Sequence, residues 1–282
     1  RSDNRERQKR LFNEQLELAR FLGLPVIVHD REAHRDVFDA LTAHKGKLEG
    51  VLHCYSGSAE LVREYAPLDF YFGFGGSLTF KGWSQVGCAP SGVGIIKING
   101  GSFTQLSDFD GALGISRGGT GAVYLESGTF TTAVSDLWVG DPNESDSSGG
   151  FADFTVAGGT ATVNGGTGVQ LANRDNMKAM VNLNGGVLVA NQIRREIRSN
   201  SPATVGFNGG TFRARTSGAL FGTGSYAPDA VSIYAGGATF DTANFSCTVP
   251  VPLSAPKDCG VSSIVIDATS GYIAPPMVTI SG

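Results

Sequence analysis

The chain has 282 residues, with 22 Lys and Arg against 26 Asp and Glu, and its net charge is −4. This balance gives no general electrostatic attraction to nucleic acid, although a local basic site is not excluded by it. No stretch of about 20 apolar residues occurs, so the sequence predicts no membrane-spanning helix, and no signal peptide is visible. Four cysteines are too few for a disulfide scaffold.

Composition changes abruptly near Gly82. Residues 1–82 hold all four histidines, 24 charged residues and 8 glycines, whereas the remaining 200 residues hold 24 charged residues and 32 glycines. A single globular domain rarely divides so sharply. We therefore expect two unrelated pieces of chain, joined near this glycine.

The first segment reads as strands alternating with helices. Its apolar spacing predicts, in chain order, a helix over Arg5–Leu22, a strand over Leu24–His29, a helix over residues 31–44, a strand over Val51–Tyr55, a helix over Ala59–Tyr65 and a strand over Asp69–Phe74. Right-handed crossovers in such a helix–βαβαβ unit would give three adjacent parallel strands.

Two histidines fall where such sheets carry function. His29 ends the first predicted strand, and His53 lies in the second, so both imidazoles could reach one metal ion at the carboxyl edge. Residues 30–32 follow as candidates for contacts to a ligand or substrate. Hydrogen-bonded structural histidines are the open alternative. His34 and His44 lie on helical pattern and are expected at the surface.

Several sequence words in this segment point to a known family. LGLPVIVHDREA, GVLHCYSGS and DFYFGFGGSLTFK, preceded by FNEQLELARFLGLP, resemble the TatD family of metal-dependent deoxyribonucleases over about residues 5–82. The resemblance implies about three strands of a TIM-like (β/α)₈ barrel and a divalent ion (Mg, Mn or Zn) held by His29 and His53. It also implies hydrolysis of DNA phosphodiester bonds by a metal-activated water, and a cytoplasmic location.

Other parts of the family pattern are missing. The chain contains no His-x-His pair, no Gly-Glu-x-Gly-Leu-Asp segment and no Glu-Thr-Asp segment. Three strands cannot close a barrel, and two imidazoles without carboxylates suit a hard divalent ion poorly. We therefore expect this segment to be a truncated hydrolase that is inactive alone, and no catalytic residue is assigned.

The second segment repeats one short sequence motif built around one glycine or a pair of glycines. Its copies are IKINGGSF (Ile96–Phe103), VYLESGTF (Val123–Phe130), FTVAGGTA (Phe154–Ala161), VNLNGGVL (Val181–Leu188), VGFNGGTF (Val205–Phe212) and the looser VSIYAGGATF (Val231–Phe240). Steps of 27, 31, 27, 24 and 26 residues separate their glycines, which predicts a mostly-β, right-handed solenoid-like fold with Val181, Leu183, Val205 and Phe207 pointing inward. An antiparallel sandwich turning at the Asn-Gly pairs is the competing fold.

These repeats resemble the autotransporter-associated β-strand repeats of bacterial surface and secreted proteins, most closely in LWVGDPNESDSSGGFADFTVAGGTATV. The resemblance implies an exported structural or adhesive protein without catalysis. The acidic loop Asp141–Gly150 is either a Ca²⁺ site or, more simply, a solvated insertion. Gln192–Asn200, with three arginines, is expected to form an exposed loop or short helix.

The sequence thus divides into a TatD-like segment (1–82), a junction (83–93), solenoid repeats (94–245) and a proline-containing β tail (246–282). Both ends are expected to be cut. Three functions remain open: a phosphodiesterase with an appended solenoid, an exported structural solenoid, and a chimeric gene-assembly product with no native function as one chain.

Overall fold

The computed structural model describes residues 2–68, 70–74, 76–88, 90, 92–106, 113–140, 149–172, 176–196 and 201–256. These residues fall into two compact units, divided between Gly75 and Gly76. The predictions for most of the acidic loop, for residues 197–200 and for the tail beyond Pro256 lie outside the described residues. The exposed loop or short helix expected over Gln192–Asn200 is wrong where the structure describes it, because Ile193–Arg195 form a strand and Ile193 is buried. Within the described part, no helix combines the length and hydropathy needed to cross a bilayer.

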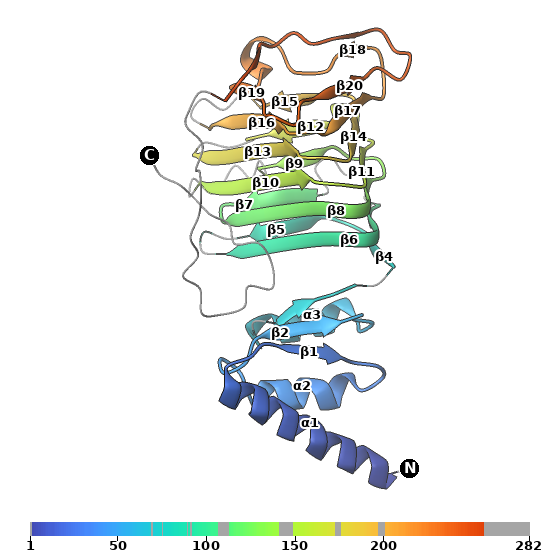
Figure 1. The fold of residues 1–282 in the computed structure, drawn as a ribbon, viewed down its shortest axis with the longest axis vertical. Coiled ribbons are helices and arrows are strands. Elements are labelled where there is room, and N and C mark those ends of the chain that lie inside the picture. Colours follow the sequence, from blue (N-terminus) through green and yellow to red (C-terminus); the bar gives the residue numbers. More distant parts are fainter. Residues whose placement is uncertain are drawn as a thin grey trace. The chain divides into compact units, whose positions relative to one another are not determined.

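The first unit is a small α/β layer (Figure 1). Its elements are α1 (Ser2–Leu22), β1 (Val26–His29), α2 (His34–Thr42), β2 (Gly50–His53), α3 (Ala59–Tyr65) with a 3-10 turn (Ala66–Leu68), and β3 (Phe70–Phe72). The strands pair in the order β1-β2-β3, and both pairs are parallel. The predicted three-stranded parallel fragment is confirmed.

One face of this sheet carries the core of the first unit. Val28 and Leu52 point into it from β1 and β2, against Leu41 of α2 and the fully buried Tyr65. Helix α1 is tied to α2 by Asp36, whose carboxylate lies 2.7 Å from the Arg5 guanidinium and 3.0 Å from the Lys9 amine. The hydrogen bond from Arg5 is the main cause that lowers the pKa of Asp36 to about 2.

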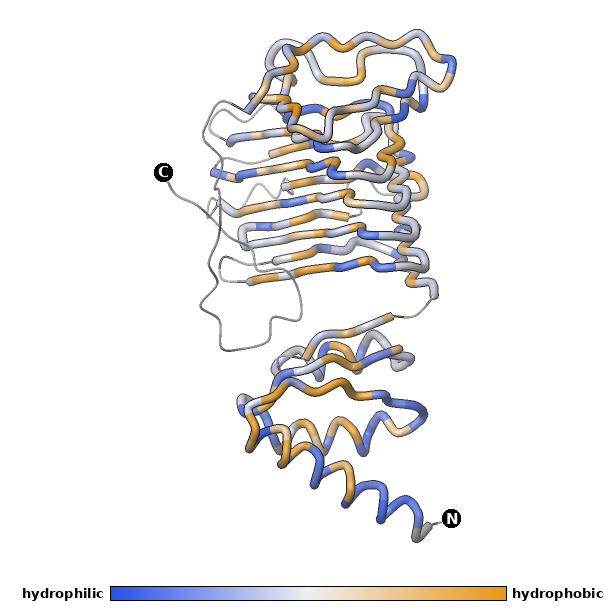
Figure 2. The backbone as a smooth tube through the Cα atoms, viewed as in Figure 1, coloured by the Kyte–Doolittle hydropathy of each residue, from blue (hydrophilic) through white to orange (hydrophobic). Residues whose placement is uncertain are grey.

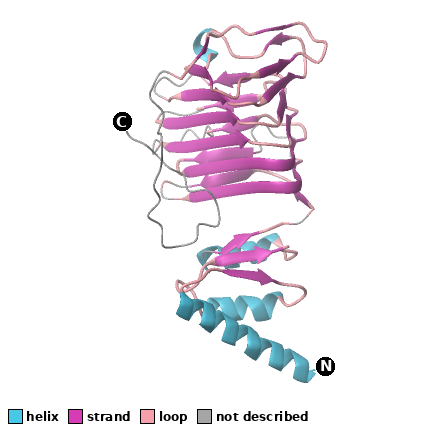
Figure 3. Ribbon diagram, viewed as in Figure 1, coloured by secondary structure: helices cyan, strands magenta, loops and turns pink. Residues whose placement is uncertain are grey.

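The second unit consists almost entirely of strands (Figure 3). They are β4 (Ser77–Phe80), β5 (Ser84–Cys88), β6 (Val93–Gln105), β7 (Leu113–Arg117), β8 (Thr120–Thr132), β9 (Leu137–Val139), β10 (Gly150–Val156), β11 (Thr160–Val163), β12 (Val169–Leu171), β13 (Met177–Leu183), β14 (Val187–Ala190), β15 (Ile193–Arg195), β16 (Ala203–Phe207), β17 (Thr211–Ala214), β18 (Gly218–Ala219), β19 (Ala230–Ile233), β20 (Thr239–Asp241), β21 (Cys247–Thr248) and β22 (Leu253–Ser254).

These strands stack in three columns, and each strand pairs in parallel with its counterpart one turn along the chain. One column runs through β4, β6, β8, β11, β14, β17 and β20, and a second through β6, β8, β10, β13, β16, β19 and β22. The third contains β5, β7, β9, β12 and β15, with β18 and β21 pairing beyond them. The solenoid is thereby confirmed, and the parallel ladders rule out the antiparallel sandwich.

The solenoid core follows the predicted alternation. Val181, Leu183, Val205 and Phe207 are all buried, and Val181 and Val205 are register partners in adjacent turns. Apolar residues recur on each successive turn, as the orange segments of Figure 2 show. Because one turn cannot bury this face alone, each turn is stabilised by its neighbours.

Glycines shape the corner between the first two columns. Gly128 and Gly159 both have positive φ, 86° and 67°, and a Cβ on either would collide with the glycine corner of the preceding turn. Glycine is therefore needed both for the backbone conformation and for the close stacking of corners. The looser last copy is two residues longer at this corner: Val205 and Val231 are 26 residues apart, but Phe212 and Phe240 are 28 apart.

The first solenoid strand comes from a sequence word that also belongs to the TatD-like pattern. In β4, Leu78 pairs with Phe103 of β6, and the Ser102 amide donates a 2.7 Å hydrogen bond to the Gly76 carbonyl. The second unit thus begins at Gly76. The segment FGFGGSLTF, which contains Gly76 and β4, is similar to the repeat segment VGFNGGTF. This similarity explains why β4 can pair as the first strand of the solenoid.

Candidate metal centre

His29 and His53 lie side by side at the carboxyl edge of the three-stranded sheet. They are the last residues of β1 and β2 and are register partners in the parallel pairing. Their ring centroids are 6.0 Å apart, and both side chains are exposed. Since Val28 and Leu52 are buried on the helix-covered face, strand alternation directs both imidazoles to the opposite face. The structure thus brings the two predicted ligands together.

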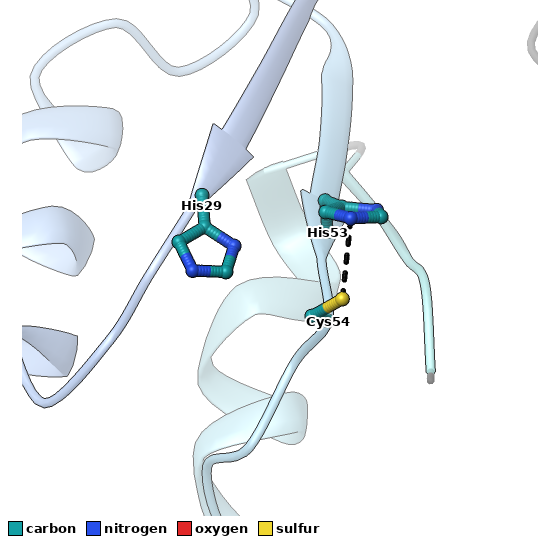
Figure 4. Close-up of side chains that lie close together, drawn as sticks. All are labelled: His29, His53 and Cys54. Atoms are coloured by element: carbon teal, nitrogen blue, oxygen red, sulfur yellow. Dashed lines mark hydrogen bonds between the residues drawn. The ribbon is translucent and has the colours of Figure 1, made fainter. Parts of the chain in front are cut away.

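A third donor joins them. The Sγ atom of Cys54 is 3.1 Å from Nε2 of His53, and one potential ligand atom from each of His29, His53 and Cys54 lies within 4.8 Å of the others (Figure 4). Among the described residues this is the one group of three or more His, Cys, Asp or Glu side chains close enough to share an ion. Cys54 was not assigned as a ligand from sequence; its position directly after His53 was the available signal.

Backbone hydrogen bonds hold this edge of the sheet in place. Gly73, just after β3, donates its amide to the Leu52 carbonyl, and its own carbonyl accepts from the Tyr55 amide, both at 2.8 Å. These two bonds flank the His53–Cys54 pair. The Tyr55 ring also packs edge-on against Phe72, 4.9 Å between centroids. The turn that carries His53 and Cys54 is therefore fixed on both sides.

Of the residues that follow His29, Asp30 has hydrogen-bond partners within its own turn. Asp30 is buried, and its carboxylate accepts a 3.1 Å hydrogen bond from the Ala33 amide and lies 2.7 Å from Nδ1 of His34. These contacts organise the turn before α2. The surface position expected for His44 is wrong: the residue is only 6% exposed, because the turn after α2 packs against α1, where Glu17 approaches it.

Comparison with known proteins supports the resemblance of this unit. The family model "TatD related DNase" matches residues 1–88. YabD of Bacillus subtilis strain 168, described as an uncharacterized metal-dependent hydrolase, is 43% identical over 75 residues, which are 26% of this chain and 29% of that protein. YjjV of Escherichia coli K12, described in the same words, is 39% identical over 75 residues, 27% of this chain and 29% of that protein.

The likeness is local. "Uncharacterized metal-dependent hydrolase TatD" of Mycobacterium tuberculosis H37Rv is 31% identical over 74 residues, 26% of this chain and 28% of that protein. The chain thus spans under a third of the length of these relatives. No solved structure matches the chain.

The metal dependence of these relatives raises the question of whether the residues present fit an ion. Two imidazoles and a sulfur are nitrogen and sulfur donors, which suit Zn²⁺ and similar ions, whereas Mg²⁺ and Mn²⁺ prefer carboxylate and water oxygens. The donor set therefore fits a borderline or soft ion and does not fit a hard one. By sequence, residues 1–88 are similar to the TatD related DNase family, and the candidate metal centre lies within this stretch.

Proposed function

We propose that the first unit is a partial metal-hydrolase segment of the TatD type, which keeps a pair of metal ligands without a complete catalytic centre. The observation that carries the proposal is the placement of His29 and His53 as register partners at the carboxyl edge of a parallel sheet. In parallel α/β sheets and barrels, functional side chains gather at this edge.

The second face of the sheet also supports a barrel segment. Ile27, Val51 and Tyr71 are register partners across the three strands, on the face opposite the helices, and Ile27 is 78% exposed. In a closed barrel this face would point inward and be filled by side chains from the other strands. Ile27 and Tyr71 are exposed and Val51 is half-buried, so this apolar row, continuous with the two histidines, is the expected surface of an opened barrel.

Hydrolysis requires more than this pair of ligands. A metal ion must activate a water and neutralise charge on the phosphate, and the carboxylates and further histidines that resemblance assigns to that task are missing from the sequence. We therefore propose that the 282-residue chain does not cleave DNA, although DNA is the substrate class that the likeness suggests.

The test is a cleavage assay on the purified chain with Mg²⁺, Mn²⁺ or Zn²⁺, using plasmid and single-stranded DNA. A full-length relative serves as the positive control. We expect no metal-dependent cleavage above the level of the His53→Ala variant. Metal-dependent cleavage that His53→Ala abolishes would overturn the proposal of an incomplete centre.

A second candidate function is structural, with the solenoid as a secreted or surface-displayed stalk of the autotransporter-associated type. Its support is the continuous core through the stacked turns, with Phe130, Phe154 and Phe207 fully buried. Cell fractionation of a bacterial host expressing the natural gene tests it. Recovery of the chain at the surface or in the medium supports export, and purely cytoplasmic recovery contradicts it.

A third possibility is that the two units were joined artificially. The two resemblances imply different compartments, and the boundary between the two units falls within FGFGGSLTF, a segment that suits both patterns. Sequencing reads across codons 76–95 of the source DNA test this directly. Continuous natural reads through that stretch would rule out an assembly product.

A further inference from the structure

We propose that His29, His53 and Cys54 form a metal site with two imidazole nitrogens and one thiolate, selective for Zn²⁺ and similar ions over Mg²⁺ and Mn²⁺. The inference rests on the metal-holding part of the proposed function and adds a third ligand and an ion class to it. It does not depend on whether the chain cleaves DNA.

The backbone at Cys54 is what makes this donor set possible. In a regular strand, consecutive side chains point to opposite faces, so His53 and Cys54 would be directed apart. Cys54 instead has φ of 53°, a left-handed conformation that is unfavourable for a non-glycine residue. This turn brings Sγ within 3.1 Å of Nε2 of His53. Two neighbouring residues thereby present their donors to the same point.

The distances suit a tetrahedral ion. Bonds of about 2.0–2.1 Å to nitrogen and about 2.3 Å to sulfur place ligand atoms about 3.3–3.6 Å apart around Zn²⁺. The donors of the three residues already lie within 4.8 Å of one another, so small side-chain rotations close the site. On binding, the Cys54 thiol loses its proton to solvent, and its contact with Nε2 of His53 is replaced by metal bonds.

The side chains around the site do not favour a hard ion such as Mg²⁺. Asp30, the acidic residue adjoining His29, directs its carboxylate to the Ala33 amide and His34. No carboxylate belongs to the donor group within the described residues. Mg²⁺ and Mn²⁺ would therefore face nitrogen and sulfur donors that they bind weakly. Because all three side chains are exposed, the ion enters from solvent and keeps at least one position for water.

The test uses the full, reduced chain and Co²⁺, which adopts zinc-type sites and reports its ligands by absorption. We expect about one Co²⁺ per chain, with a near-ultraviolet sulfur-to-cobalt band and visible bands of tetrahedral intensity. Stoichiometric Zn²⁺ should remove these bands, and a hundredfold excess of Mg²⁺ should leave them unchanged. Circular dichroism of every variant checks that it is folded.

Variants separate the three ligands from other residues. Cys54→Ser and Cys54→Ala should each abolish the sulfur band, and His29→Ala and His53→Ala should each weaken Co²⁺ binding at least tenfold. The matched control is Cys88→Ser, which removes another exposed free cysteine and should keep the spectrum. A sulfur-to-cobalt band that is still present in both Cys54 variants would contradict the proposal.

The outcomes also separate this inference from the proposed function. Co²⁺ bound through His29 and His53 without a sulfur band contradicts the thiolate ligand but leaves the histidine pair in place. An absence of any Co²⁺ or Zn²⁺ binding contradicts both. Metal-dependent DNA cleavage would contradict the proposal that the catalytic centre is incomplete. The assignment of the three ligands would still be decided by the Co²⁺ spectra of the variants.

Discussion

Phe103 and Phe130 stack face to face inside the solenoid, with ring centroids 5.2 Å apart and ring planes inclined by only 8°. They are register partners on β6 and β8, so the stack follows directly from the parallel pairing of two turns. Phe80 extends it on one side and Phe154 lies 5.1 Å from Phe130 on the other. These packed rings connect successive turns through their side chains, in addition to the backbone hydrogen bonds between the paired strands.

Removing the Phe130 ring, which contacts both Phe103 and Phe154, should therefore destabilise the solenoid strongly. Phe130 is fully buried, and we expect Phe130→Ala to lower the free energy of unfolding by about 3–5 kcal/mol, from lost burial and the cavity left behind. Phe245→Ala is the control, because that ring is 40% exposed and should cost much less. Urea unfolding followed by circular dichroism measures both. Equal losses in the two variants would contradict the stacked core.

Two glycines at the corners allow the cost of an unfavourable backbone conformation to be measured separately from the cost of a steric clash with the preceding turn. Gly159 and Gly237 both have positive φ, 67° and 77°, but a Cβ at Gly159 would collide with Gly128 of the preceding turn, whereas a Cβ at Gly237 meets nothing within 4 Å. We expect Gly237→Ala to cost about 1–2 kcal/mol from backbone conformation alone. Gly159→Ala should cost clearly more, because the stacked backbones must move apart. Chemical unfolding that finds the same cost for both would contradict this account of the corner.

A buried carboxylate should make the solenoid less stable as the pH rises. Burial raises the pKa of Asp153 above its ordinary value of 3.8, despite hydrogen bonds from Thr155 and Asn182. Between that value and the raised pKa, the folded state binds more protons than the unfolded state. Wild-type stability relative to Asp153→Asn should therefore fall as the pH rises through this window and level off above it.

Asp241 is the control for that experiment, because its pKa is shifted in the opposite direction from that of Asp153. A hydrogen bond from the Ala243 amide, with a further one from Arg213, lowers the pKa of Asp241. The stability that this carboxylate contributes should be present above pH 3.8 and lost as the pH falls through its lowered pKa. Unfolding curves of the wild type, Asp153→Asn and Asp241→Asn between about pH 3 and about pH 7 measure how the stability difference of each variant from the wild type changes with pH. Parallel pH trends in both variants would contradict these assignments.

The sequence was sufficient to predict the parts with a regular apolar pattern. Val181 and Leu183 alternate with polar residues beside a glycine pair, which is why their burial and the stacking of turns were predictable. The third column was not, since strands such as β9 and β12 are only three residues long and carry no period of their own. They form because the two longer columns bring those segments together.

The candidate site was predictable only in part. His29 ended one predicted strand and His53 lay within the next, so their proximity followed from parallel pairing. The approach of Cys54 depends on a left-handed φ that no alternation pattern reveals, and the inward turn of Asp30 depends on hydrogen bonds to the start of α2. Both are local backbone effects that become visible only once the chain is folded.

The start of the solenoid gives a last prediction. Leu78 of β4 packs against the solenoid core, whereas Thr79 on the same strand is exposed. We expect limited proteolysis of the full chain to leave a resistant body whose first residue precedes Ser77, because β4 is paired with β6. Leu78→Asp should release β4 and move the first resistant residue beyond Phe80, while Thr79→Asp should leave it unchanged. Mass spectrometry of the fragments identifies the new amino termini; wild-type cleavage confined to residues 82–94 would instead place the boundary after β4 and contradict its role as the first strand.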